Sequence, residues 1–306
     1  MQMPAATDRA TSSASGRHRR VGIALMLSSS ASNQAGAGLG VMAFPMIGTV
    51  GVVAIRQFTT ALVLAPTVRP SLRGLRRDQW PPIVGLVLVY SVMNLSLYTA
   101  VDRIGLALAV TLEFLGPLTV AIAGSRRLLD MGCALLAGAG VVVLTQPGPA
   151  TDFVGVSLAL VAGTCWGTYV LLNRTVGQRL PGLQGTATAA VVTALAWTPI
   201  AIAWFATHVP TVAAIALATA CGVMSSIAPY VADLLALRRV PAQMFGTFTS
   251  VNPVWAALAG WVLLGQALAA HEWFGIGLIV VSNAVLSARG SRECPAYNRF
   301  SKKNCA

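Results

Sequence analysis

Ten apolar windows cover most of this chain and constrain its fold more than any other feature. A helix that crosses the hydrocarbon core of a bilayer needs about 20 predominantly apolar residues. Because helices satisfy their backbone hydrogen bonds internally, they can span lipid. The pattern therefore predicts an all-α integral membrane protein with disordered tails at residues 1–20 and 289–306. Its ten transmembrane helices are expected near residues 21–43, 48–66, 82–101, 104–124, 128–146, 154–173, 184–206, 210–237, 241–264 and 271–288.

The composition agrees with a membrane location and gives the charge its meaning. Hydrophobic residues make up 56% of the chain and charged residues 10%, whereas soluble domains average roughly 25% charged residues. The formal net charge is +12. If both termini are cytoplasmic, the inside segments hold every Lys and Arg except Arg56 and Arg103, as the positive-inside rule requires. The bias predicts a multi-pass protein of the inner or plasma membrane with both termini inside, and it argues against a nucleic-acid partner.

Two pairs of segments repeat at a nearly constant offset. Residues 21–25 read VGIAL and residues 154–158 read VGVSL, while residues 103–105 match residues 239–241 further on. Consistent offsets indicate an ancient duplication of a five-helix unit, with copies at residues 21–150 and 151–288. Because an odd number of crossings turns the second copy upside down, the pattern predicts the inverted repeats of secondary transporters, which bind substrate near the midplane.

One segment resembles a known family. Residues 106–121 read LALAVTLEFLGPLTVA, which is similar to the fourth helix of EamA-type transporters in the drug/metabolite transporter superfamily. Among these it looks most like the inner-membrane threonine/homoserine exporters, where a glutamate lies in the same setting. The likeness extends over nearly all of residues 21–287, and it implies export of small polar metabolites such as these amino acids. Asn252 and Gln266 depart from it, because relatives commonly carry glutamate there.

Three ionisable residues within the predicted helices are candidates for substrate binding and proton coupling. Glu113 lies near the middle of its window, where a charge costs roughly 2.5–3.5 kcal/mol on insertion scales. It could exchange a proton or hold a substrate ammonium group, or it could only bond a neighbouring helix. Arg56 could snorkel to the outer interface or pair with a substrate carboxylate. Asp233 could pair with Arg238 and Arg239 at the cytoplasmic mouth or face the cavity.

Polar residues at helical spacing mark the faces expected to line a cavity, although interhelical hydrogen bonds would explain the same spacing. Pro117 and Pro253 are expected to break backbone hydrogen bonds in mid-helix. The predicted cavity-lining residues are Ser32, Asn33, Asn94, Tyr98, Trp166, Tyr169, Tyr230, Thr249 and Asn252.

Enzyme signatures are absent in the form that catalysis would need. The sequence has no H-E-x-x-H, G-x-S-x-G or Walker A motif, and its five cysteines give no metal-ligand spacing. We therefore expect a secondary transporter with no cofactor or metal, whose partners are a small-molecule substrate, protons and the lipid bilayer. The alternatives are the same fold with another cargo, such as a cationic drug, a purine or a lipid-linked precursor, or a membrane sensor or assembly partner that transports nothing.

Overall fold

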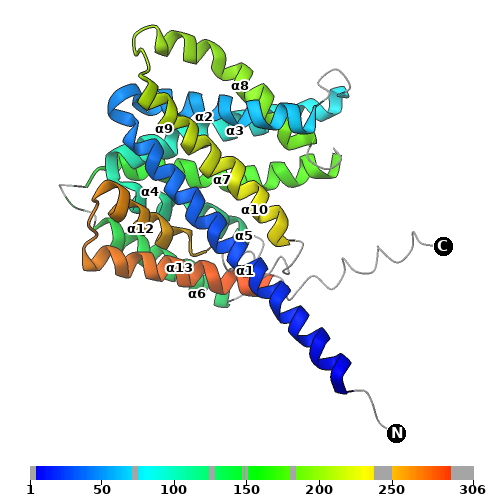
Figure 1. Cartoon of the computed structure of the whole chain (residues 1–306). Helices are drawn as coiled ribbons and strands as arrows, with labels where there is room; N and C mark the ends of the chain where they lie inside the picture. The colour runs from blue at the N-terminus through cyan, green and yellow to red at the C-terminus, as the bar shows by residue number, and fades with distance from the viewer. Residues whose placement is uncertain are drawn as a thin grey trace.

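A computed structural model describes residues 5–70, 75–123, 128–146, 148, 151–179, 184–237 and 250–290. Within these ranges the chain is helical with short connections and contains no β-strand (Figure 1). Five helical segments in the described ranges are long and apolar enough to cross a membrane, namely Phe44–Val68, Arg77–Ile104, Phe153–Asn173, Gln184–Phe205 and Val212–Asp233. Shorter apolar helices lie at Leu106–Val120, Met131–Thr145 and Asn252–Leu264.

Each apolar window coincides, over its described part, with one helix or with a run of consecutive helices. The first half contains α1 (Ala5–Met42), α2 (Phe44–Val68), η2 (Arg77–Gln79), α3 (Trp80–Ile104), α4 (Leu106–Glu113), α5 (Leu115–Ala123) and α6 (Leu128–Thr145). The second half contains α7 (Phe153–Arg179), α8 (Gln184–Phe205), α9 (Val212–Gly222), the π-helical turn η3 (Val223–Ile227), α10 (Ala228–Leu237), α12 (Asn252–Leu264) and α13 (Ala270–Gly290).

Helix α1 is longer than the first apolar window. The sequence predicts a disordered tail over residues 1–20, but α1 begins at Ala5, and its first turns project from the bundle (Figure 1). A helix that has already nucleated extends at little cost, because each further residue adds one backbone hydrogen bond. The structure thus differs from the prediction over residues 5–20. At the other terminus α13 ends at Gly290, and residues 291–306 lie outside the described ranges.

The helices pack in pairs around a shared apolar core. Helix α3 lies against α7, α2 against α8, α6 against α13, and α1 against α9, α10 and α12 (Figure 1). The core cluster includes the fully buried Ile47, Leu112 and Ile279. Many large apolar side chains instead point outward, including Leu62 and Leu135, and an apolar outer surface of this extent is typical of a protein surrounded by lipid.

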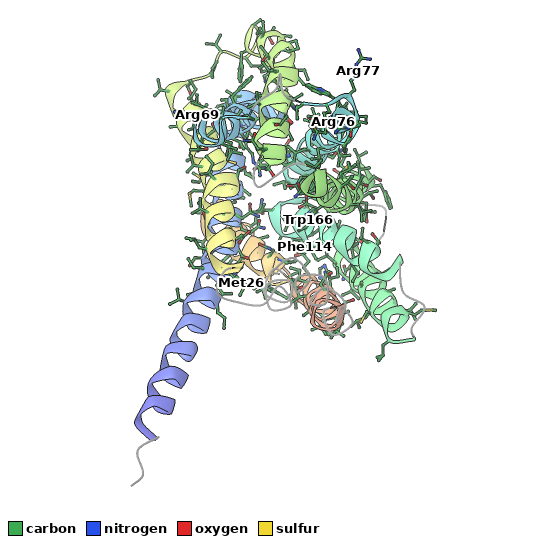
Figure 2. The ribbon with its side chains drawn as sticks, turned by 90° about the vertical axis from the view of Figure 1, so that its right-hand side faces the viewer. Met26, Arg69, Arg76, Arg77, Phe114 and Trp166 are labelled. Atoms are coloured by element: carbon green, nitrogen blue, oxygen red, sulfur yellow. The ribbon has the colours of Figure 1, made fainter. Side chains whose placement is uncertain are left out.

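The two ends of the bundle differ in charge. At one end α2 finishes and α3 begins, and this arginine end carries Arg69, Arg76 and Arg77 (Figure 2). Helix α1 starts and α13 finishes on the same side (Figure 1). The opposite end contains the turn at Ala43 between α1 and α2 and the turn at Gly105 between α3 and α4.

Candidate functional site

A cavity of about 380 Å³ lies among the helices and is lined by residues from both halves of the chain. Its inner wall includes Glu113 and Phe114, at the break between α4 and α5. It also reaches Leu64 near the end of α2, Thr186 near the start of α8, and Asp233 on α10. Because α2 ends and α8 begins at the arginine end, the cavity extends from the middle of the bundle toward that end.

Arg56 of α2 is held by hydrogen bonds to two other elements, α3 and η3. Its Nη1 donates to Asn94 Oδ1 at 2.7 Å and to the Tyr98 hydroxyl at 3.2 Å. Its Nε donates to Ser226 Oγ at 3.2 Å, and its Nη2 makes a longer contact of 3.4 Å with the Ser225 carbonyl oxygen. The guanidinium carbon lies 5.5 Å from the centre of the Tyr98 ring. Arg56 is therefore fixed at the cavity wall by α2, α3 and η3 and does not snorkel to the outer interface.

The positive charge of Arg56 is not compensated by these contacts. Its four partners are an amide oxygen, two hydroxyls and a backbone carbonyl, all of them neutral. Among the described residues no carboxylate forms a salt bridge with it. Glu113 lines the same cavity without reaching Arg56. A cation and an acid thus share one space and make no direct ion pair there.

The break between α4 and α5 positions Glu113. Pro117 lies in the first turn of α5, and a proline ring cannot bond the carbonyl four residues earlier, here that of Glu113. Helix α7 comes close at Gly163, where a Cβ would lie 2.8 Å from the Glu113 carbonyl oxygen. The Glu113 side chain is buried at the cavity wall, and within the described ranges no hydrogen bond or salt bridge engages its carboxylate.

Two aromatic pairs complete one side of the cavity. Phe114 and Trp166 meet edge to face, with ring centres 4.4 Å apart, and they lie near the middle of the bundle in Figure 2. Tyr90 and Tyr169 are tilted, with ring centres 6.0 Å apart. All four residues line the cavity, so the Arg56 and Glu113 groups face a space with a partly apolar, rigid wall.

Most of the residues that the sequence nominates meet at this cavity. Those that line it are Arg56, Glu113, Asp233, Asn33, Asn94, Tyr98, Trp166 and Tyr169. Two others make helix-to-helix contacts outside the cavity lining: Ser32 donates to the Met224 carbonyl oxygen at 2.9 Å, and the Asn252 amide oxygen accepts from Gln34 Nε2 at 3.5 Å. Ser32 and Asn252 therefore fit the alternative prediction for these helix faces, which is hydrogen bonding between helices.

Three of the predicted residues, Thr249, Tyr230 and Pro253, are not placed at the cavity by the described structure. Thr249 and the side chain of Tyr230 lie outside the described part of the chain. Residues 250–251 form a turn and α12 begins at Asn252, so Pro253 occupies the first turn of a helix and not its middle. A proline in the first turn removes no helical hydrogen bond.

Asp233 of α10 lines the part of the cavity nearest the arginine end. Helix α10 packs against α1 there, and Ser29 of α1 donates a hydrogen bond of 3.4 Å to the Pro229 carbonyl oxygen. Arg238 and Arg239 lie outside the described residues, so their pairing with Asp233 stays a prediction.

Several cavity residues escape the sequence analysis. Gln34 lines the cavity and directly follows Ser32 and Asn33 in α1. The polar residues before it could therefore have identified Gln34 as a cavity residue. Ser225 and Ser226 could not be found by helical spacing. They lie in the π-helical turn η3, where the wider turn shifts the register of the residues that follow.

Near the opposite end of the bundle the cavity lining is buried: Val101 and Leu106, which line it there, are 4% and 1% exposed. Val41 lines both the cavity and a second hollow of about 500 Å³ at that end, which Phe44 and Trp204 also line. The Phe44 ring packs edge to face on Tyr98, with centres 5.8 Å apart. Residues 44–47, here called the Phe44 turn, lie between the turn at Ala43 and a break at Gly48, whose φ of +67° favours glycine. Trp204 Nε1 donates to the Ile47 carbonyl oxygen at 2.8 Å and holds the turn down.

Comparisons with known proteins agree with a transporter. The model of the EamA-like transporter family matches residues 153–288. The threonine/homoserine exporter RhtA of Escherichia coli (strain K12) is 33% identical over 85% of this chain and 89% of the relative. RhtA of Salmonella typhimurium (strain LT2) is 33% identical over 88% of this chain and 90% of the relative.

The fold is also known from a solved crystal structure. That structure superposes with a TM-score of 0.59 at 20% identity and covers 90% of this chain and 99% of its own, so the two share a fold. With a third of its residues identical to RhtA over most of both chains, this multi-pass membrane protein belongs to the EamA-like transporter family.

Proposed function

We propose that this protein is a secondary exporter of small amino acids such as threonine and homoserine, which works by alternating access and exchanges substrate for protons. The observation that carries the proposal is the Glu113 carboxyl, which lines the cavity and has no hydrogen-bond partner among the described residues. An unpartnered carboxyl in a membrane-embedded cavity can alternate between a proton and a substrate ammonium group. The substrates named for the RhtA relatives are amino acids.

The charge distribution supports an inward-facing state. Both termini and the arginine end are cytoplasmic in this proposal, because Lys and Arg concentrate on the cytoplasmic side of membrane proteins. The cavity extends toward that end, whereas its lining near the other end, where the Phe44 turn lies, is buried. A substrate would therefore enter from the cytoplasm and leave after the Phe44 turn opens.

The packing pattern supports ten transmembrane helices in two inverted repeats. Suppose that α1 corresponds to α7, α2 to α8, α3 to α9–α10, α4–α5 to α12, and α6 to α13. Each pair of helices that pack together should then have a counterpart pair that also packs together. The packing of α3 on α7 then has its counterpart in α10 on α1, and α5 on α7 in α12 on α1. The pairs α2 with α8, α4 with α12, and α6 with α13 map onto themselves, as a pseudo-two-fold axis requires.

The Glu113→Gln exchange tests the proton-coupling role. Glutamine keeps the volume and hydrogen-bonding capacity of the side chain but cannot titrate, so the variant should insert and fold normally while its net pH-driven efflux of threonine falls to background. Efflux from proteoliposomes at matched protein density measures this. Glu272→Gln, in the exposed first turn of α13, is the matched control and should transport normally. Near-normal pH-driven efflux by the Glu113 variant would remove Glu113 from the mechanism and leave Asp233 as the next acid of the cavity.

The two aromatic pairs suit two alternative cargo classes, purines and organic cations. A purine could stack on them, and an organic cation could lie over a ring face. The same proteoliposomes separate these functions when they are loaded in parallel with amino acids, a purine and a cationic drug. Protein that moves none of the three classes would favour a sensor or assembly role.

A further inference from the structure

We propose that the guanidinium of Arg56 binds the α-carboxylate of the transported molecule while Glu113 holds its ammonium group, so that the site selects α-amino acid zwitterions. This assignment rests on the proposed export function and goes beyond it, because it names the chemical groups that the cavity recognises and the residue that recognises each.

The first argument is that, among the described residues, no carboxylate forms a direct ion pair with Arg56. A cation inside a membrane-spanning bundle is costly unless an anion or a set of hydrogen bonds offsets it. Neutral partners satisfy most of its N–H groups but leave its charge in place. Because Arg56 lines the cavity, the counter-anion can be a ligand that comes and goes.

The donor geometry is the second argument. A guanidinium has five N–H donors, and the bonds to Asn94, Tyr98 and Ser226 fix its plane through Nη1 and Nε. Nη2 makes only the 3.4 Å contact with the Ser225 carbonyl in the described structure. It therefore keeps one N–H for a ligand and holds the other weakly. A donor that is held in a fixed direction on a rigid plane suits a carboxylate oxygen better than the flexible ammonium group of a lysine would.

The placement of Glu113 is the third argument. It lines the same cavity and forms no salt bridge with Arg56 within the described residues. A ligand that carries both a carboxylate and an ammonium group neutralises the two residues at once, whereas an amine or an acid alone neutralises one and leaves the other charged. A volume of about 380 Å³ also lies in the range of small-molecule pockets, roughly 300–1,000 Å³.

A structural role is the competing explanation for Arg56, since the same bonds tie α2, α3 and η3 together. A purely structural arginine would affect every ligand equally when it is changed. A carboxylate-binding arginine affects only ligands that carry a carboxylate. Ligands that lack one charge or the other can therefore separate the two roles.

The experiment measures binding of three ligands to purified wild-type protein and to two variants. Threonine has both charges, threonine methyl ester lacks the carboxylate, and N-acetylthreonine lacks the ammonium group. Arg56→Lys should weaken threonine and N-acetylthreonine about ten-fold or more and leave the methyl ester unchanged. Glu113→Gln should weaken threonine and the methyl ester and leave N-acetylthreonine unchanged. Tryptophan fluorescence is a convenient signal, because Trp166 lines the cavity.

A third variant keeps the test decisive if Arg56→Lys fails to fold. Asn94→Asp is nearly isosteric and supplies an internal carboxylate 2.7 Å from Arg56 Nη1. It should compete with the substrate carboxylate, so threonine binding weakens while methyl ester binding does not. If Arg56→Lys and Asn94→Asp each weaken the binding of threonine and of its methyl ester equally, the assignment is overturned. Wild-type protein that binds none of the three ligands overturns the proposed amino-acid function itself, and the assignment with it.

Discussion

Gln266, where the family resemblance leads one to expect glutamate, accepts a hydrogen bond that a glutamate oxygen could also accept. Its Oε1 accepts a hydrogen bond of 3.1 Å from the backbone N–H of Leu106, the first residue of α4. The first N–H groups of a helix have no partner within the helix. The side-chain oxygen of Gln266, which follows α12 in the sequence, therefore caps the N-terminus of α4, the helix that ends at Glu113.

The first prediction concerns this cap. Gln266→Glu should keep thermal stability in detergent near the wild-type value, because a carboxylate oxygen accepts the same bond and suits the helix N-terminus. Gln266→Leu should lose about 1 kcal/mol, because the Leu106 N–H loses its acceptor. Thermal unfolding of the two variants, measured side by side, checks this; equal stability of the leucine variant and the wild type would mean that the cap is dispensable.

At the scale of single residues, the sequence predicts the charged groups of the site better than their partners. Glu113 and Arg56 could be nominated because ionisable residues in apolar windows are rare. The partners of Arg56 come from segments that lie 38 and 170 residues away along the chain, and Ser226 lies on a π-helical turn. No local pattern encodes such a turn, so tertiary packing decides which hydroxyl meets the guanidinium.

At the scale of elements, the Phe44 turn lies at the opposite end of the bundle and borders the second hollow, which shares Val41 with the cavity. It is bounded by Ala43 and Gly48, packs through Phe44 on Tyr98, and is held by one hydrogen bond from Trp204. The Tyr98 hydroxyl also accepts a hydrogen bond from Arg56, so Tyr98 connects the Phe44 turn to the site. Opening of the turn and occupancy of the site can therefore influence each other.

The second prediction concerns the Trp204 hydrogen bond. Trp204→Phe keeps an aromatic ring and removes the N–H donor, so the Phe44 turn should open more often. A cysteine at position 41, in a background without native cysteines, should then react about five-fold faster with a membrane-impermeant thiol reagent from outside, as expected for loss of about 1 kcal/mol. Trp261→Phe on the exposed face of α12 is the control. Unchanged labelling in the Trp204 variant would exclude the bond as a latch.

The helices themselves were largely predictable, and their interruptions were not. Twenty-residue apolar windows identify helices because lipid permits little else. The break at Phe114 follows from Pro117, which the sequence displays, whereas the break at Gly48 and the extension of α1 to Ala5 depend on neighbouring helices and on helix propagation. Glycine at position 48 gave no signal among 29 glycines.

At the scale of the whole molecule, the third prediction is the topology. If the ten predicted helices cross the membrane, nearly all Lys and Arg residues lie on one side, and both termini should be cytoplasmic. A reporter that is active only in the periplasm should be silent when it is fused after Ser287, and the same reporter fused at residue 208, between α8 and α9, should be active. Activity at the first site and silence at the second would reverse the orientation and remove the basis for an inward-facing state.

The wall formed by Val41, Phe44 and Tyr98 also has an electrical consequence. In the proposed inward-facing state the cavity is open to the cytoplasm and fills with electrolyte, so the membrane voltage falls mainly across this wall. Moving one elementary charge through 100 mV involves about 2.3 kcal/mol. A zwitterion crosses the wall without that energy, whereas a proton bound for Glu113 crosses it with its charge. Exchange of an amino acid for a proton would therefore be electrogenic, and a membrane potential alone would drive export when the pH is equal on both sides.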